Sequence, residues 1–103
     1  MGLFGNIFGA GTDTEKVKEM IKNGATIIDV RTRSEFTNGH VAGSKNIPLQ
    51  EVQSRVDEFK KMKNGIVLCC ASGNRSGQAT DFLKSQGLEC VNGGGWKQVN
   101  ALV

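Results

Sequence analysis

The 103-residue sequence lacks the features that would mark several whole classes of protein. It has no apolar run long enough to span a bilayer, and its apolar N-terminus, MGLFGNIFGAG, lacks the basic start of a secretion signal. A single histidine and three cysteines in no ligand spacing argue against a zinc site. The net charge of +3 is too small to indicate a nucleic-acid-binding surface. We therefore expect a soluble protein that binds no metal, membrane or nucleic acid.

The cysteines are too few and too badly spaced for a disulfide framework. Cys69, Cys70 and Cys90 make an odd count, and two of them are adjacent, which is poor geometry for a structural bridge. Free thiols of this kind are typical of a reducing compartment. We expect a cytoplasmic monomer, with Cys90 packed in the core.

Short apolar runs rich in β-branched residues alternate with amphipathic stretches along the chain. This pattern predicts an α/β fold of three layers, in which a mostly parallel central sheet is flanked by helices on both faces. Thr12 and Glu15 form a capping box that predicts a helix start near Asp13. The expected strands lie in residues 25–31, 45–49, 65–70 and 88–91; the expected helices lie in residues 13–24, 34–37, 49–61 and 75–87, and a last one begins at Trp96 after a turn at NGGG, residues 92–95.

The segment VLCCASGNRSGQA runs from the end of a buried strand into a helix. Residues 70–75, here called the Cys70 loop, therefore lie at the strand end where ligands bind in such sheets. If the loop curls, the backbone N–H groups of residues 71–75 form an anion-binding cradle at the helix N-terminus. Gly73 and Asn74 tolerate the positive φ of such a curl, and Arg75 adds a permanent cation. These residues favour a reactive thiolate beside bound negative charge.

Two cysteines compete for the role of nucleophile. Cys69 and Arg75 have the C-x5-R spacing of cysteine phosphatases, whereas Cys70 and Arg75 have the C-x4-R spacing of sulfur-transfer enzymes. Side chains alternate along a strand, so if Cys70 points into the cradle, Cys69 points to the opposite face and packs there. The lone histidine, His40, could pair with a cysteine, but we expect a structural role for it.

Three segments together resemble the rhodanese family of sulfurtransferases. They are IIDVRTRSEFTNGHVAGSKNIPL, IVLCCASGNRSGQA and GGGW, in the family's order and spacing. The resemblance implies a rhodanese-like domain over residues 12–103 with a flexible N-terminal arm at residues 1–11. It matches Cys70 to the cysteine that forms a persulfide. It also implies that loops of six residues, as here, handle sulfur donors, whereas loops of seven residues occur in related phosphatases and arsenate reductases.

The resemblance implies transfer of sulfane sulfur from a donor such as thiosulfate to a thiol or to cyanide, without a cofactor. The expected partners are a small anionic donor and a thiol acceptor such as a small redox protein. Besides the catalytic Cys70, the expected substrate-binding residues are Ala71, Ser72, Gly73, Asn74, Arg75 and Arg31. Arg31 has a second interpretation, as part of an ion-pair and capping network with Asp29 and Glu35.

Two other functions stay open. One is a phosphatase or arsenate reductase that uses Cys69, although neither Trp96 nor Pro48 has a neighbouring aspartate to act as the general acid of a tyrosine phosphatase. The other is a non-catalytic rhodanese module that only binds a partner.

Overall fold

The computed structural model describes residues 14–103. The proposed arm at residues 1–11 and the capping residue Thr12 lie outside the described residues. The elements in chain order are α2 (Thr14–Lys22), β1 (Thr26–Asp29), α3 (Arg33–Thr37), β2 (Lys45–Asn46), α4 (Leu49–Val52), the 3-10 helix η1 (Gln53–Arg55), α5 (Val56–Lys60), β3 (Ile66–Cys70), α6 (Asn74–Ser85), β4 (Cys90–Gly95) and α7 (Trp96–Asn100).

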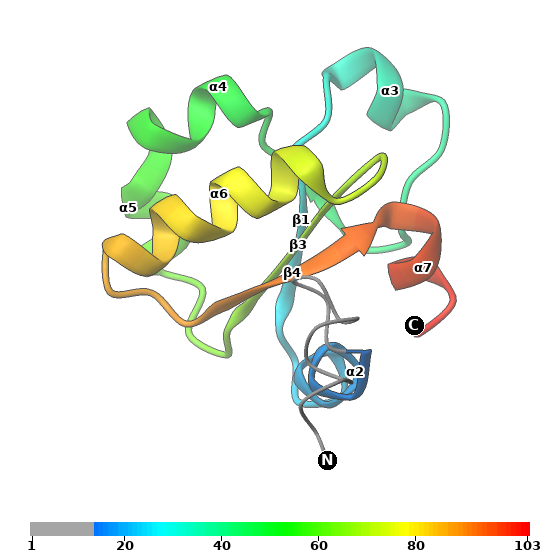
Figure 1. Ribbon diagram of the computed structural model, residues 1–103, viewed down its shortest axis with the longest axis horizontal. Coiled ribbons are helices and arrows are strands. Elements are labelled where there is room, and N and C mark those ends of the chain that lie inside the picture. Colours follow the sequence, from blue (N-terminus) through cyan, green and yellow to red (C-terminus); the bar gives the residue numbers. More distant parts are fainter. Residues whose placement is uncertain (1–13) are drawn as a thin grey trace.

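The four strands form one parallel sheet in the order β2-β1-β3-β4. Helices α4, α5 and α6 lie on one side of this sheet, and α2 and α7 lie on the other (Figure 1). The expected three-layer α/β architecture is thus confirmed. In the part of the chain that the structure describes, no helix is both long and apolar enough to cross a bilayer.

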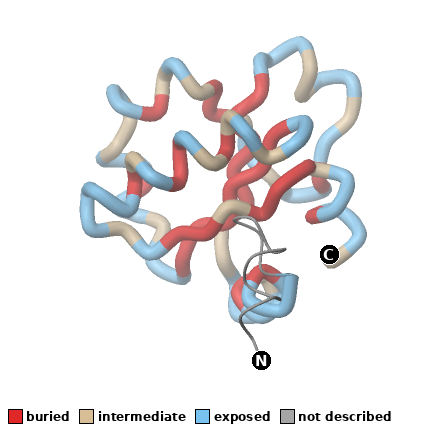
Figure 2. Tube along the Cα trace, viewed as in Figure 1, coloured by how far each residue is buried: buried red, intermediate tan, exposed pale blue. Residues whose placement is uncertain are grey.

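Two apolar clusters, one on each face, hold the layers together, and the buried residues follow the sheet (Figure 2). The larger cluster lies between the sheet and α4 to α6, and its members include Ile28, Leu68, Phe59, Leu83 and Cys90. Cys90 is therefore a core residue, as expected. The smaller cluster lies between the sheet and α2 and α7, and it includes Val17, Ile27, Val67 and Val99. Burial of these side chains is the main favourable term in folding.

Strand β3 has neighbours on both sides and all five of its residues are buried. Because side chains alternate along a strand, its residues divide between the two apolar clusters. Leu68 and Cys70 belong to the larger cluster, whereas Val67 and Cys69 belong to the smaller one. The prediction that the two adjacent cysteines point to opposite faces is confirmed.

The predicted turn at residues 92–95 is wrong, because these residues continue strand β4. A run of glycines is typical of a turn, but here the glycines allow close packing against β3. A Cβ on Gly93 would lie 2.7 Å from Cγ2 of Val99 and 3.1 Å from the carbonyl oxygen of Leu68. The pairing register shifts at this point: Leu68 pairs with Asn92, but Cys69 pairs with Gly94, so Gly93 is the extra residue of a β-bulge.

Other boundaries differ by a few residues. The expected strand at 45–49 is only Lys45–Asn46, since Pro48 has no N–H for a ladder and instead precedes helix α4. The expected helix at 49–61 is divided by the 3-10 turn Gln53–Arg55 into α4 and α5. The predicted helix after residue 95 is confirmed as α7.

Candidate active site

The Cys70 loop joins the central strand β3 to the long helix α6. Cys70 is the last residue of β3, and α6 begins at Asn74. Gly73 is the residue before the helix and has a φ of 104°, which a side chain would strain. The loop also has no room there, because a Cβ on Gly73 would lie 3.3 Å from Cα of Gly94 in β4. The sharp turn therefore depends on glycine at this position.

The sulfur of Cys70 receives several hydrogen bonds from the start of α6. The backbone N–H of Gly73 donates to Sγ at 3.0 Å, and the backbone N–H of Ser76 lies 3.4 Å from it. The hydroxyl of Ser76 is also 3.4 Å from Sγ. Converging N–H groups at the N-terminus of a 12-residue helix form an environment that favours an anion.

These donors change the acidity of the thiol. Burial raises the pKa of Cys70, but hydrogen bonds from the Ser76 hydroxyl and from the backbone of Ser76, Ser72 and Gly73 outweigh it. The net effect is a pKa below the ordinary value for cysteine. A thiolate is the nucleophilic form of cysteine, so the lowered pKa favours the nucleophilic form of Cys70.

Cys69 has the opposite environment. Its side chain is fully buried among apolar residues of the smaller cluster, including Val17 and Val67. Burial, reinforced by the negative charge of Asp29, raises the pKa of Cys69 to about 12. A thiol of this kind is a packing residue and stays protonated at neutral pH.

The predicted binding residues occupy different parts of the loop. Ala71, Ser72 and Asn74 are exposed, and Gly73 is half-buried. Of the predicted N–H donors at residues 71–75, Gly73 donates directly to the sulfur and the backbone of Ser72 contributes to its acidity. A substrate-binding role for residues 71–75 stays a prediction.

Ser76 is a functional candidate that the sequence argument missed. It is fully buried, and both its backbone N–H and its hydroxyl face the sulfur of Cys70. Its hydroxyl also donates to Oδ1 of Asn92 in β4 at 2.7 Å. In the sequence, Ser76 could have been found from its position directly after Arg75, in the first turn of the predicted helix. Asn92 is 22 residues beyond Cys70, and only the folded structure shows that it lies beside the loop.

Arg75 is paired with a carboxylate from the short helix α3. Its guanidinium makes two hydrogen bonds to Glu35 of α3, at 2.8 and 3.1 Å. Glu35 also completes a capping box with Thr32. The bond from Arg75, assisted by the backbone of Thr32, lowers the pKa of Glu35 to about 2. The pair is about one-third exposed and joins α3 to the start of α6, and the Arg75 cation also interacts with Cys70.

Arg31 is the most firmly held of the predicted residues. Its side chain is buried and forms a two-pronged ion pair with Asp29, with a shortest contact of 2.7 Å. It also donates to the carbonyl oxygen of Gly39 and lies over the ring of Trp96 at 4.9 Å. These bonds support the network interpretation, and contact between Arg31 and a sulfur donor stays a prediction.

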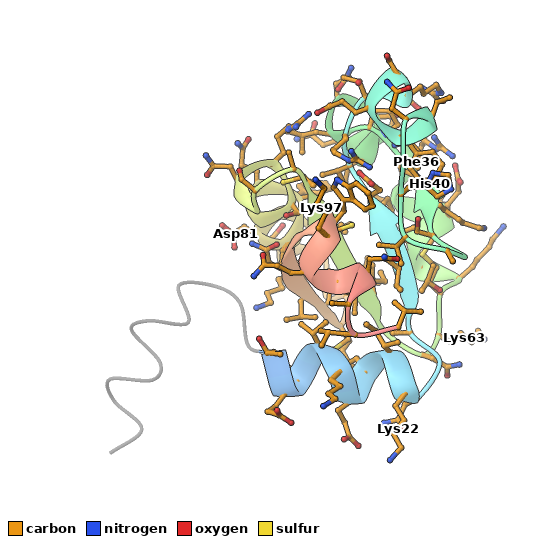
Figure 3. The ribbon with its side chains drawn as sticks, turned by 90° about the vertical axis from the view of Figure 1, so that its right-hand side faces the viewer. Lys22, Phe36, His40, Lys63, Asp81 and Lys97 are labelled. Atoms are coloured by element: carbon orange, nitrogen blue, oxygen red, sulfur yellow. The ribbon has the colours of Figure 1, made fainter. Side chains whose placement is uncertain are left out.

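His40 packs against its own segment of the chain. The ring of His40 stacks on Phe36 at a centroid distance of 3.7 Å, and its Nδ1 lies 2.7 Å from the carbonyl oxygen of Phe36 (Figure 3). Its contacts are therefore with its own loop and not with a cysteine. Across residues 14–103, no three His, Cys, Asp or Glu side chains are grouped to hold a metal ion.

Comparison with known proteins identifies the family of this chain. The model of the rhodanese-like domain family matches residues 13–102. Thiosulfate sulfurtransferase PspE of Escherichia coli is 40% identical over 74 residues, which cover 70% of this chain and 71% of PspE. YqhL of Bacillus subtilis is 40% identical over 63 residues, or 61% of this chain, and the match spans only about half (49%) of YqhL. A solved structure described as a rhodanese with anions from E. coli has 36% identity and a TM-score of 0.65, covering 71% of this chain and 88% of that one.

Proposed function

The chain belongs to the rhodanese-like domain family, and from that premise we propose that it is a sulfurtransferase in which Cys70 carries the transferred sulfur. The observation that carries the proposal is the group of hydrogen-bond donors on the Cys70 sulfur, from Gly73 and Ser76. They favour the thiolate before the reaction and an anionic persulfide after it. The similarity to a named thiosulfate sulfurtransferase supports the same reaction.

In the first step the Cys70 thiolate attacks the outer sulfur of thiosulfate. A new S–S bond forms between Cys70 and that sulfur, the S–S bond within thiosulfate breaks, and sulfite leaves with the electron pair. The product is a Cys70 persulfide anion. The donor must be small, since Cys70 is only 1% exposed. Ala71, Ser72, Gly73, Asn74 and Arg75 line its approach in this proposal.

In the second step an acceptor removes the outer sulfur. A thiolate or cyanide attacks that sulfur, the persulfide S–S bond breaks, and the Cys70 thiolate is regenerated. The acceptor leaves as a persulfide or as thiocyanate. This two-step covalent route predicts ping-pong kinetics. Arg75 holds its charge throughout, because a guanidinium does not titrate in the working range, so its part is electrostatic.

The experiment that tests the proposal is thiosulfate treatment of the full chain, followed by intact mass measurement and peptide mapping. We expect a gain of one sulfur atom on the peptide that holds Cys70, and loss of that atom to cyanide with release of thiocyanate. No gain in mass would favour the non-catalytic binding module. A gain on Cys69 with Cys70 free would overturn the assignment, and hydrolysis of aryl phosphates would favour the phosphatase.

A further inference from the structure

Asn92 of the edge strand β4 lies between the Cys70 loop and helix α6. It precedes the β-bulge at Gly93, and bulges commonly redirect a neighbouring side chain. Its amide makes three hydrogen bonds. Nδ2 donates to the carbonyl oxygen of Gly73 at 3.0 Å, and Oδ1 accepts from the Ser76 hydroxyl at 2.7 Å and from the Gly94 N–H at 3.0 Å.

Chemistry fixes the orientation of this amide. The Gly94 N–H can only donate, so the atom that it meets must be the amide oxygen. The Gly73 carbonyl can only accept, so the atom on that side must be the amide nitrogen. With the amide flipped, its NH2 group would face the Gly94 N–H and its oxygen would face the Gly73 carbonyl oxygen, and neither contact would be a hydrogen bond. Asn92 thus hydrogen-bonds to both Gly73 and Ser76, each of which donates to the Cys70 sulfur.

We propose that Asn92 is a positioning residue for the Cys70 sulfur, which tethers Gly73 through its carbonyl and Ser76 through its hydroxyl so that the N–H groups of both residues stay on the sulfur. The inference deepens the proposed function, on which it rests for the identity of Cys70 as the sulfur carrier. Asn92 itself bonds to neither cysteine, and it acts only through the two donor residues.

The space around Asn92 is fitted to its side chain. A Cβ on Gly77 in α6 would lie 3.3 Å from Nδ2 of Asn92, so the helix leaves room for this side chain by having glycine there. Asn92 also lines an open groove of about 430 Å³ between α6 and β4, together with Gln78 and Asp81. Asn92 and Gly73 both line this groove, so the bond between them lies at the open side of the Cys70 loop.

Loss of the Asn92 amide would change the hydrogen bonds to the Cys70 sulfur in two opposite ways, one through Ser76 and one through Gly73. Ser76 has one hydroxyl proton, which is shared between Oδ1 of Asn92 at 2.7 Å and the Cys70 sulfur at 3.4 Å. Removing the amide frees the proton for the sulfur but releases Gly73. The Gly73 contact is the shorter one to sulfur, 3.0 against 3.4 Å, so we expect its loss to dominate.

The charged groups near Cys70 come from other elements. Arg75 in α6, which is paired with Glu35 of α3, interacts with Cys70, whereas Asp29 at the end of β1 and Arg31 just after it interact with the second thiol, Cys69 in β3. Asn92 hydrogen-bonds to none of them. A change of the thiol titration after substitution of Asn92 by a neutral residue thus reports the hydrogen bonds and not a new charge.

The test is the pH profile of Cys70 alkylation by iodoacetamide in the full chain, which needs no sulfur transfer. We expect N92A to move the midpoint upward by about half a pH unit and the neutral, nearly isosteric N92L by up to about one unit, since both variants lose the bond to the Gly73 carbonyl. Rates of transfer from thiosulfate should fall about threefold to tenfold in parallel. Q78A, an amide removed from the same groove, is the control and should match the native profile.

Each outcome decides the inference. Folding is checked first by circular dichroism and thermal unfolding, and N92L serves if N92A does not fold, because it is neutral and has nearly the same shape as asparagine. A native profile in a folded N92A or N92L protein overturns the positioning role. A downward shift in N92A overturns the Gly73 tether. If the native protein takes up no sulfur but the profiles shift as expected, the proposed function fails and the positioning of the Cys70 sulfur stands.

Discussion

Cys69 and Cys70 are neighbours in one strand, yet they have opposite chemistry. Cys69 is surrounded by apolar side chains on the α2 and α7 side, and burial raises the pKa of its thiol to about 12. Cys70 is just as buried, and burial again raises the pKa of its thiol, but the donors of Ser76, Ser72 and Gly73 reverse the result. The difference teaches that burial alone does not decide thiol reactivity. What decides it is whether N–H and O–H groups converge on the sulfur.

The largest expected effect comes from removing each sulfur in turn. We expect C70S to lose sulfur uptake from thiosulfate entirely, because a hydroxyl is not a comparable nucleophile at neutral pH. C69S should keep most of the native rate, since Cys69 has no part in the proposed transfer. Thiocyanate formation with cyanide as acceptor measures both. Equal loss in the two variants would break the distinction between the cysteines.

The second effect is selectivity of alkylation in the native protein. With the pKa of Cys69 at about 12 and that of Cys70 below its ordinary value of 9.0, their thiolate fractions at neutral pH differ by about a thousandfold or more. Because the pKa of Cys70 is lowered, its alkylation should reach a plateau at lower pH than that of a peptide thiol. Peptide mapping after brief iodoacetamide treatment checks this, and comparable labelling of Cys69 would contradict it.

A longer loop should affect Cys70 but not Cys69. One glycine inserted between Ser72 and Gly73 moves the Gly73 N–H away from the sulfur and makes the Cys70 loop seven residues long. Misplacement of donors of this kind costs about a hundredfold in rate, so thiosulfate transfer should fall by about that factor. Circular dichroism shows whether the fold survives. A folded insertion variant with full transfer would show that loop length does not select the substrate.

A smaller shift should follow from the ion pair beside the loop. The positive charge of Arg75 interacts favourably with the Cys70 thiolate, so R75A should raise the pKa of Cys70 and slow alkylation at neutral pH by about threefold. E35Q is the matched variant, because it keeps Arg75 but removes the opposing charge. It should shift the alkylation profile the other way. Shifts of the same sign in both variants would mean that the pair acts only by holding the loop.

The smallest effect concerns stability on the Cys69 side. C69S places a hydroxyl in an apolar cluster, which should lower the free energy of unfolding by about 1 to 2 kcal/mol. C69A loses only packing and should cost about 1 kcal/mol or less. Chemical denaturation measures both. An unchanged stability in C69S would indicate a polar partner for that position and would weaken the contrast with Cys70.

Sequence reasoning was most successful where local pattern and fold agree. The buried run before Cys70 predicted β3, and strand alternation placed Cys69 and Cys70 on opposite faces. It failed where a contact between distant segments decides the structure. Residues 92–95 look like a turn, but their glycines let β4 pack closely on β3, and the partners of Ser76 and Arg75 come from β4 and α3.

The strand order has a consequence for the synthesis of the chain. The Cys70 loop closes against β4, where a Cβ on Gly95 would lie 3.0 Å from the carbonyl oxygen of Ala71, and β4 begins 20 residues after Cys70. A chain that has emerged from the ribosome only as far as α6 has both cysteines but lacks the strand that closes the loop. Parallel pairing of this kind is a late, non-local event in folding. The donors to the Cys70 sulfur are thus synthesised before the strand that packs on the loop, and we expect the loop to reach its final geometry only when β4 docks.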